Sequence, residues 1–248
     1  MGRVAGKVAL ITGGASGLGA EDARVLAREG ASIVITDMQE ELGRAVAAEI
    51  LGAIFLAHDV RDEARWVEVV AETIRHFGRL DVLVNNAGLV RFANVEACTL
   101  DDFRLQTSVM IDGTFLGCKT AIPHMTKGGG GSIINMASVA GLKGISSIPA
   151  YTAAKGAIIA MTRSIAVHCQ EQGYKIRVNA LAPGAHDTPM TRQALAQLAP
   201  DSAGLDQISD QGQGQPADVA NLVLFLASEE SRQITGTTMV IDNGETMG

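Results

Sequence analysis

A tyrosine and a lysine stand four positions apart in the segment "YTAAK", residues 151–155. On a helix, side chains at this spacing lie on one face, one turn apart. A protonated amine beside a phenol favours the phenolate and moves the tyrosine pKa down from about 10, so that Tyr151 can exchange a proton with an alcohol. For an isolated pair at this spacing, a surface tyrosine beside a solvated lysine is the favoured interpretation. An acid/base pair is the alternative, and it needs support from the rest of the chain.

A glycine-rich segment, "TGGASGLG" at residues 12–19, follows an apolar run and opens a helical pattern. Its glycines allow a tight turn, and the free N–H groups at a helix start attract an anion such as a pyrophosphate. The spacing GxxxGxG differs from the commoner GxGxxG, and a simple turn is the alternative. Between a strand and a helix the segment predicts a dinucleotide site. The contacts predicted here are Gly13, Ser16, Gly17, Leu18 and Gly19.

The second expected strand, "SIVITD", ends in Asp37. A carboxylate at this place accepts hydrogen bonds from an adenosine ribose and repels a 2′-phosphate. Ser16 in the glycine turn carries no positive charge either, so the cofactor predicted is NAD rather than NADP. A polar cap at a strand end is the structural alternative for Asp37.

Two further strand ends carry candidate cofactor contacts. The segment "HDV" could hold adenine, and "NNAG" at residues 85–88 could shape the floor beneath the cofactor. Ligands of open α/β sheets bind at the carboxyl ends of the strands, where all these segments are expected. The candidates beyond Asp37 are Met38, Asp59, Val60, Asn86, Ala87 and Gly88.

The elements that must position these groups alternate between apolar strands and helical patterns. The expected strands are "KVALIT", "SIVITD", "AIFLAHDV", "LDVLVNNAG", "GSIINMAS", "IRVNALAP" and "TTMVID". Helices are expected between them, including one over about residues 100–125 and one over about 151–172. This rhythm predicts a single-domain, Rossmann-type, doubly wound parallel α/β sheet over residues 1–248. Residues 189–216 break the rhythm and are expected to cover the substrate.

Composition narrows the classes of function. A formal net charge of −7 argues against a nucleic-acid partner. Three scattered cysteines and dispersed histidines indicate neither a disulfide framework nor a metal site. No apolar run reaches the roughly 18 residues of a membrane span, so a soluble, cytoplasmic protein without a membrane partner is expected.

The motifs together resemble the short-chain dehydrogenase/reductase family, and the resemblance covers the whole chain. It rests on "TGGASGLG", Asp37, "NNAG", Ser138 in "SIINMAS", "YTAAK", "IRVNALAPG" and "PGAHDTPM", which stand in the family's order. The resemblance implies that Tyr151 exchanges the alcohol proton, Ser138 orients the substrate oxygen and Lys155 binds the nicotinamide ribose, while hydride passes between substrate and nicotinamide. It also implies that Pro183, Gly184 and Thr188 contact the nicotinamide carboxamide.

The expected substrate is a small hydrophobic hydroxyl or keto compound. The candidate substrate contacts are Ser138, Val139, Leu142, Ile145, Tyr151 and Met190. Arg91, Lys143 and Arg192 could reach the rim of this pocket but form no cluster in the sequence. Within the family, the chain is most similar to bacterial hydroxysteroid and alicyclic alcohol dehydrogenases. The family's pairing of its fifth and sixth helices implies a homotetramer, with a dimer as the alternative.

The chain departs from the family at Met110, where the family usually has an asparagine that supports a water chain to the lysine. A thioether cannot replace the donors of an amide. The favoured interpretation is an active NAD-dependent enzyme, and the alternative is a catalytically weakened NAD-binding or regulatory protein. A ketoreductase for carrier-bound acyl substrates is a further alternative, which Asp37 and the lack of a basic docking patch disfavour.

Overall fold

The computed structural model describes residues 2–198 and 213–247. In this part of the chain, seven parallel strands form one sheet in the order β3-β2-β1-β4-β5-β6-β7. The strands are β1 (Val8–Thr12), β2 (Ser32–Asp37), β3 (Ile54–Ala57), β4 (Val82–Asn85), β5 (Gly131–Met136), β6 (Ile176–Pro183) and β7 (Thr238–Ile241). The predicted Rossmann-type α/β class is confirmed. The order reverses beside β1, and such a reversal opens a ligand crevice at the carboxyl ends of the strands.

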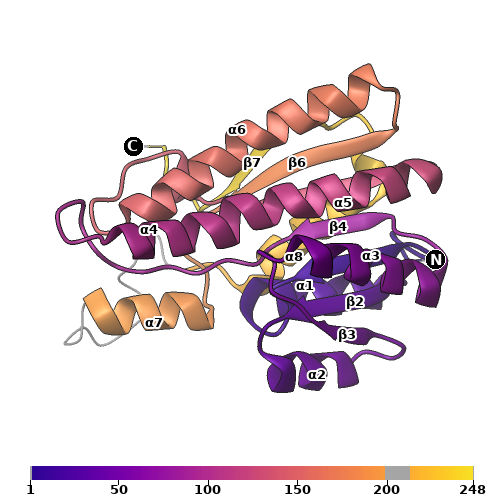
Figure 1. The fold of residues 1–248 in the computed structure, drawn as a ribbon, viewed down its shortest axis with the longest axis horizontal. Coiled ribbons are helices and arrows are strands. Elements are labelled where there is room, and N and C mark those ends of the chain that lie inside the picture. Colours follow the sequence, from indigo (N-terminus) through magenta and orange to yellow (C-terminus); the bar gives the residue numbers. More distant parts are fainter. Residues whose placement is uncertain (1, 199–212, 248) are drawn as a thin grey trace.

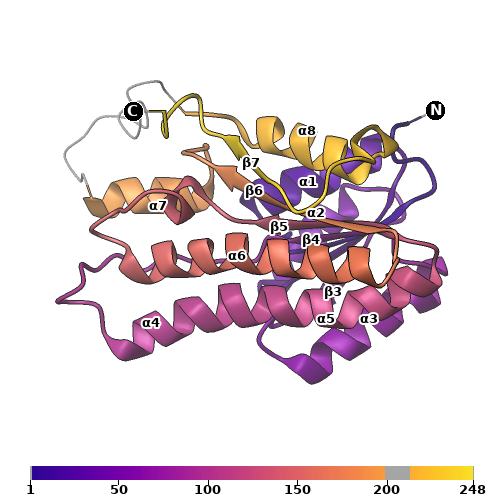
Figure 2. The ribbon, with the colours of Figure 1, turned by 90° about the horizontal axis from the view of Figure 1, so that it is seen from above.

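Helices cover both faces of the sheet (Figures 1 and 2). One face carries α1 (Gly17–Arg28), α2 (Glu40–Ala48) and α8 (Pro216–Ala227). The other carries α3 (Glu63–Phe77), α4 (Leu100–Thr107), α5 (Gly113–Lys127) and α6 (Pro149–Glu171). The short helix α7 (Pro189–Leu198) follows β6 and lies beyond the carboxyl ends of the strands.

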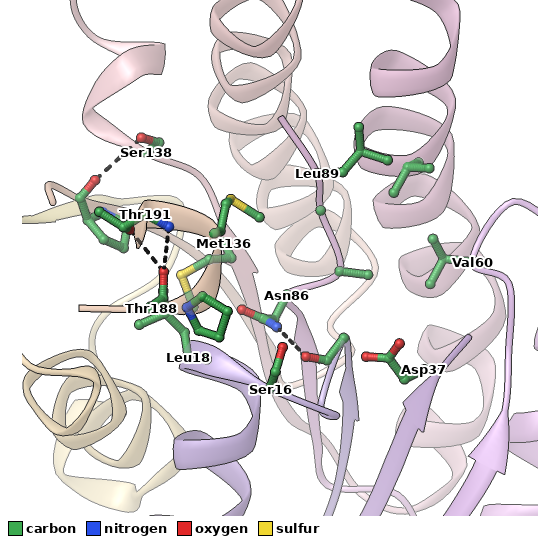
Figure 3. Close-up of a pocket in the computed structure, with 18 of the residues that line it drawn as sticks. Ser16, Leu18, Asp37, Val60, Asn86, Leu89, Met136, Ser138, Thr188 and Thr191 are labelled. Carbon is green, nitrogen blue, oxygen red and sulfur yellow. Dashed lines mark hydrogen bonds between the residues drawn. The ribbon is translucent and has the colours of Figure 1, made fainter. Parts of the chain in front are cut away.

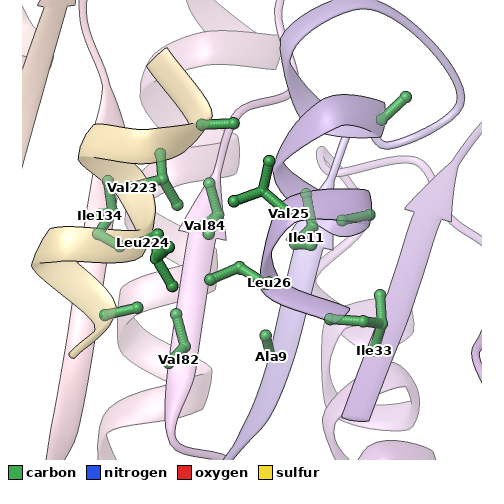
Figure 4. Close-up of a cluster of buried hydrophobic side chains, with 14 of the residues drawn as sticks. Ala9, Ile11, Val25, Leu26, Ile33, Val82, Val84, Ile134, Val223 and Leu224 are labelled. Atoms are coloured by element: carbon green, nitrogen blue, oxygen red, sulfur yellow. The ribbon is translucent and has the colours of Figure 1, made fainter. Parts of the chain in front are cut away.

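Alternate strand residues enter two separate hydrophobic cores, because successive side chains of a strand point to opposite faces. Ala9 and Ile11 of β1 pack with Leu26 of α1 and Leu224 of α8 (Figure 4). Leu10, between them, belongs to the other core with Trp66 of α3. Both faces of the sheet are therefore dry, which explains the continuous apolar runs of the sequence and fixes the strand ends that build the site.

The helix expected over about residues 100–125 contains a π-helical turn. The structure has α4, then the π-turn Ser108–Asp112, then α5. Thr99 begins this continuous rod, because its hydroxyl accepts the N–H of Asp102 at 3.1 Å. A π-turn inserts one extra residue into a helix and often marks a functional site. Hydrophobic periodicity does not reveal it, because the apolar pattern continues on both sides.

The segment expected to cover the substrate is described only at its ends, and residues 199–212 lie outside the described part of the chain. At one end is α7, and at the other Gly214 forms a parallel bridge with His186. The N–H of Asp187 donates to the Gly214 carbonyl oxygen at 2.9 Å, and the N–H of Gly214 donates to Ala185 at 3.0 Å. These bonds anchor the return of the segment against the end of β6.

Within the described ranges, no helix has the length and apolar character needed to cross a membrane. The three cysteines are free thiols. The same ranges hold no group of three or more histidine, cysteine or acidic side chains that could bind a metal ion.

Candidate active site

A cavity of about 390 Å³ crosses the carboxyl ends of the strands (Figure 3). Asp37 and Val60 lie at one side of it, and Ser138 lies at the opposite side with Thr191. Most of the predicted site residues line this one cavity. They are Gly13, Ser16, Gly17, Leu18, Asp37, Met38, Asp59, Val60, Asn86, Ala87, Gly88, Ser138, Tyr151, Lys155, Pro183, Gly184, Thr188 and Met190.

Four predicted residues do not line the cavity. Gly19 faces the side-chain amide of Asn86 instead. Val139 is buried in a short 3-10 turn, and Leu142 is 46% exposed on the outer surface. Ile145 is partly exposed in the loop before α6. These three residues follow Ser138 through a 3-10 turn and lie outside the cavity lining, so their contact with a substrate stays a prediction.

Other lining residues were not among the predicted site residues. These are Gln39, His58, Leu89, Val109, Met136, Ala137, His186, Pro189 and Thr191. Most of them adjoin a predicted residue, so adjacency along the chain could have indicated them. Val109 adjoins Met110, but the sequence did not show that Val109 rather than Met110 would meet the cavity, because this depends on the π-turn.

The glycine turn is braced by the strand beside it. Gly13 and Gly17 adopt φ of 64° and 56°, which favours glycine. The amide nitrogen of Asn86 donates to the carbonyl oxygens of Thr12 at 3.0 Å and Gly13 at 3.1 Å. The hydroxyl of Thr12 accepts the N–H groups of Asn86 and Ala87, both at 3.0 Å. The turn at β1 and the end of β4 therefore form one hydrogen-bonded platform.

A carboxylate is fixed at the β2 end of the cavity. The Asp37 oxygens accept the backbone N–H groups of Ala15 at 3.1 Å and Gln39 at 3.0 Å. Lys155 is the only lysine or arginine among the lining residues that the structure describes, and it lies at the opposite end. A 2′-phosphate beside Asp37 would thus meet a negative charge with no cation to balance it.

A second carboxylate, that of Asp59, follows the neighbouring strand β3 and is paired within the chain. Asp59 forms a bidentate pair with Arg61, whose Nη2 lies 2.6 Å from Oδ2, and this hydrogen bond lowers the Asp59 pKa. His58 is buried, bonds Thr36 at 3.2 Å and packs edge-on against Trp66. Burial lowers the pKa of His58 to about 4, so its ring is neutral and closes the cavity without adding charge.

Ser138 and Pro183 meet at the other side of the cavity. The Ser138 hydroxyl donates to the Pro183 carbonyl oxygen at 3.4 Å and accepts the N–H of Ala140 at 3.1 Å. The bond to Pro183 is long, which leaves the hydroxyl able to turn towards a stronger acceptor. Ser138 is thereby held at the tip of β5 with a donor available to a ligand oxygen.

Tyr151 and Lys155 face the cavity from the first turns of α6. The Lys155 ammonium lies 5.4 Å from the centre of the Tyr151 ring and donates to the carbonyl oxygen of Met136 at 2.6 Å. Burial raises the pKa of Tyr151 to about 12, against a smaller lowering by the Ser138 hydroxyl. Burial also lowers the pKa of Lys155 to about 7.

The expected fall in the tyrosine pKa is therefore not found in the chain by itself. Burial of the phenol is the larger cause and the Ser138 hydroxyl the smaller one, while the Lys155 ammonium lies 5.4 Å from the ring centre and has its own pKa lowered by burial. The predicted proximity of the pair is confirmed, and its role in proton exchange stays a prediction.

Met110 lies in the π-turn and is completely buried. Its side chain packs with Ala137, Ala154 and Ile158, and Tyr151 packs against the same cluster. Its Sδ lies 3.6 Å from the position that a Cβ on Gly88 would occupy, so it sits directly behind the cavity lining. An apolar side chain thus fills the space behind the tyrosine and the lysine.

The loop after β6 forms the remaining edge. Thr188 and Thr191 share a hydrogen bond of 2.9 Å at the start of α7. His186 is buried and bonds the Gly184 carbonyl at 3.0 Å, so its ring supports the loop. Asp187 pairs with Arg192 away from this edge.

Comparison with known proteins agrees with this geometry. A family model described as Enoyl-(Acyl carrier protein) reductase, of the short-chain alcohol dehydrogenase type, matches residues 13–246. The chain belongs to the short-chain dehydrogenase/reductase family. This is a family of oxidoreductases whose dehydrogenases use a nicotinamide cofactor.

Relatives in this dehydrogenase family span almost the whole chain. Trans-4-hydroxycyclohexanecarboxylate dehydrogenase of Sinomonas cyclohexanicum is 43% identical, with 99% of this chain and 95% of the relative covered. A 3-beta-hydroxysteroid dehydrogenase of Comamonas testosteroni is 42% identical, with 97% and 96% covered. The crystal structure of levodione reductase matches with a TM-score of 0.92 at 34% identity, covering 99% of this chain and 100% of that one.

Proposed function

We propose that this chain is an NAD-dependent oxidoreductase that interconverts a hydrophobic secondary alcohol, cyclic or hydroxysteroid-like, and its ketone. The observation that carries the proposal is a single cavity with Ser138, Tyr151 and Lys155 at one end and the Asp37 carboxylate at the other. Few other functions require a proton-exchanging phenol and a ribose-binding carboxylate in the same crevice.

The residues present fit the cofactor. The platform of Gly13, Gly17 and Asn86 would hold the pyrophosphate, and Asp37 would accept the adenosine ribose hydroxyls. Lys155 would bind the second ribose, and Thr188 would bind the carboxamide. The bound nicotinamide supplies the acceptor or donor of hydride.

The chain's own residues would handle the proton and the substrate oxygen. Ser138 would turn from Pro183 to donate to that oxygen, which fixes the reacting carbon. Tyr151 would take the alcohol proton during oxidation and return it during ketone reduction. Lys155, held by the Met136 carbonyl, would stabilise the phenolate through its positive charge.

The preference for NAD rests on Asp37. One relative, from Lentilactobacillus kefiri, is named as an NADP-dependent (R)-specific alcohol dehydrogenase and is 38% identical, so the family alone does not decide the cofactor. The bonds that Asp37 accepts from Ala15 and Gln39 keep its carboxylate at the place where a 2′-phosphate would be repelled.

Cyclic substrates are favoured because several relatives carry a ring alcohol in their names, including the cyclohexanecarboxylate and hydroxysteroid dehydrogenases. Leu89, Val109 and Met190 give the described part of the substrate end an apolar wall, which suits a ring.

We extend the proposal to a cytoplasmic homotetramer. Three free thiols suit a reducing compartment. A groove between α5 and α6 includes Phe115, Ile122 and Ile165, and Phe115 is 49% exposed. A second copy of the chain packed across a twofold axis would cover this apolar surface.

A second candidate function is an NAD-binding protein with weak turnover. It is favoured by the buried thioether of Met110, which cannot donate a hydrogen bond as an amide at this position would. A ketoreductase on carrier-bound acyl chains is a third candidate, which a preference for NADPH would support.

The deciding experiment measures reduced-nicotinamide absorbance with NAD and, separately, NADP against a panel of cyclic and steroid secondary alcohols. We expect NAD-dependent turnover that Tyr151→Phe abolishes while leaving NADH binding, followed by fluorescence, unchanged. Tyr174→Phe is the matched control, because Tyr174 lies at the α5–α6 groove. NADH binding without turnover on the whole panel would favour the second candidate.

A further inference from the structure

The three basic residues expected near the substrate rim differ in their partners. Arg192 is bound to Asp187 through two hydrogen bonds, of 2.7 and 2.8 Å. Lys143 is bound to Glu245 at 2.8 Å. Both positive charges are therefore balanced within the chain, and an anionic ligand would have to compete with a carboxylate for either of them.

Arg91 is the exception. Its guanidinium forms no hydrogen bond or ion pair with any of the described residues, and the residue is exposed. Its backbone is nevertheless fixed, because the N–H of Arg91 donates to the side-chain oxygen of Gln106 at 3.1 Å and Gln106 is completely buried. An unpaired cation thus stands on an anchored part of the loop.

The position of this loop places Arg91 at the substrate end. Leu89, two residues earlier, lines the cavity (Figure 3). The N–H of Ala93, two residues later, donates at 2.9 Å to Ser147, which lies on the chain between Ser138 and Tyr151. Two residues span at most about 7 Å. Arg91 itself is outside the lining, but its loop is tied on one side to a lining residue and on the other to the chain between Ser138 and Tyr151, which places it at the rim of the substrate end.

We propose that Arg91 is an anion subsite, and that the substrate is a cyclic alcohol or ketone bearing a carboxylate on the side away from the reacting oxygen. This inference rests on the proposed dehydrogenase function for the position of the hydroxyl. Guanidinium binds carboxylate through two parallel hydrogen bonds, which would orient the ring as well as hold it. The chain has a net charge of −7, so a free cation is the feature that lets an anion approach.

The test compares 4-hydroxycyclohexanecarboxylate with its carboxamide, which has the same ring and hydroxyl but no charge. We expect Arg91→Gln to lower kcat/KM for the acid by about tenfold to a hundredfold through KM, and to change the carboxamide about twofold or less. Arg104→Gln is the matched control, because Arg104 is exposed on α4 and no cavity-lining residue stands within four positions of it, whereas Leu89 of the lining is two positions from Arg91. High salt should reduce the preference for the acid.

Two outcomes would overturn the subsite and leave the dehydrogenase standing. In one, the unchanged chain turns over acid and carboxamide equally well. In the other, Lys143→Gln removes the preference for the acid while Arg91→Gln keeps it, which would mean that Lys143 exchanges Glu245 for the substrate.

A binding measurement separates the subsite from the proposed reaction. Cyclohexanecarboxylate has no hydroxyl to oxidise, so calorimetric titration into the chain saturated with NADH reports the anion contact alone. We expect binding that Arg91→Gln abolishes and Arg104→Gln preserves. If this holds while no alcohol is turned over, the subsite stands and the dehydrogenase proposal falls. If Arg91→Gln binds the probe as tightly as the unchanged chain, the subsite falls.

Discussion

The ammonium nitrogen of Lys155 lies 2.6 Å from the carbonyl oxygen of Met136, the last residue of β5. Lys155 is only 4% exposed, so this backbone oxygen is a principal stabiliser of its charge. A carbonyl dipole offsets desolvation less than a carboxylate does, and burial holds the pKa of Lys155 at about 7. The charge beside Tyr151 therefore depends on the Met136 carbonyl at the end of β5 and on the other groups around the Lys155 ammonium.

This arrangement predicts how stability depends on pH. The pKa of Lys155 is lowered from 10.5 to about 7, so between these values the unfolded chain binds a proton that the folded chain has lost. The contribution of Lys155 to the free energy of unfolding therefore rises with pH across this window and is least favourable below pH 7. Lys155→Met should raise the melting temperature more at pH 6 than at pH 9. Equal gains at both values would show that the buried lysine keeps its ordinary pKa.

Met110→Asn should increase turnover severalfold. The amide would offer hydrogen bonds where the thioether offers only contact, so the ammonium of Lys155 is better stabilised and its pKa rises. The pH at which kcat falls on the alkaline side should shift upward by a similar amount. Met110→Leu is the control that keeps the site apolar. Because Met110 is completely buried, the asparagine should also cost about 2–4 kcal/mol of stability. A faster enzyme with an unchanged pH profile would contradict the link to Lys155.

Asp37→Ala should weaken the proposed preference for NAD. Removing the carboxylate takes away the acceptor for the ribose hydroxyls and the repulsion of a 2′-phosphate, so the ratio of NADPH to NADH affinity should rise about tenfold or more. Fluorescence titration with each reduced cofactor measures this without any substrate. Glu40→Ala, at an exposed position three residues away, is the control and should leave the ratio unchanged. An unchanged ratio in Asp37→Ala would place cofactor selection elsewhere.

Asp22→Asn should stabilise the chain at neutral pH. Asp22 is completely buried in α1, and neither carboxylate oxygen has a hydrogen-bond partner among the described residues. Burial raises the folded-state pKa of Asp22 well above 3.8. The contribution of Asp22 to the free energy of unfolding is therefore fully present below pH 3.8, and it is lost as the pH rises through the folded-state pKa. We expect a gain of about 1–3 kcal/mol in urea unfolding at pH 8 and little gain at pH 4. A loss at pH 8 would mean that the carboxylate has a partner.

The sequence was sufficient to predict the sheet and most of the cavity, for a local reason. Each cofactor segment, such as the glycine turn or Asp37, stands directly after a strand, and parallel strands bring their carboxyl ends together. Knowing the strands therefore meant knowing which side chains converge. The roles proposed for those side chains remain predictions that the experiments above test.

The sequence did not predict those features of the structure that leave no pattern of residue types. The π-turn at Ser108–Asp112 changes which residue faces the cavity without changing the apolar rhythm. The 3-10 turn after Ser138 directs Val139 inward and leaves Leu142 on the surface. The direction of the Tyr151 pKa shift could not be read from charge proximity, because desolvation is the larger cause in the folded chain.

Long-range ion pairs could not be predicted either. Arg91, Lys143 and Arg192 look equivalent in the sequence, and only the fold shows that Glu245 reaches Lys143 from the far end of the chain. Arg91 can be recognised as unpaired only when the ion pairs of all the described residues are known.

The platform formed by Asn86 and the glycine turn has a kinetic consequence. Because its hydrogen bonds join two strand ends, the surface for the dinucleotide is already assembled, whereas the substrate end depends on loops. Pre-assembly favours a compulsory order in which the dinucleotide arrives first and departs last. In product-inhibition experiments, NADH should then compete with NAD, whereas the ketone should not compete with the alcohol.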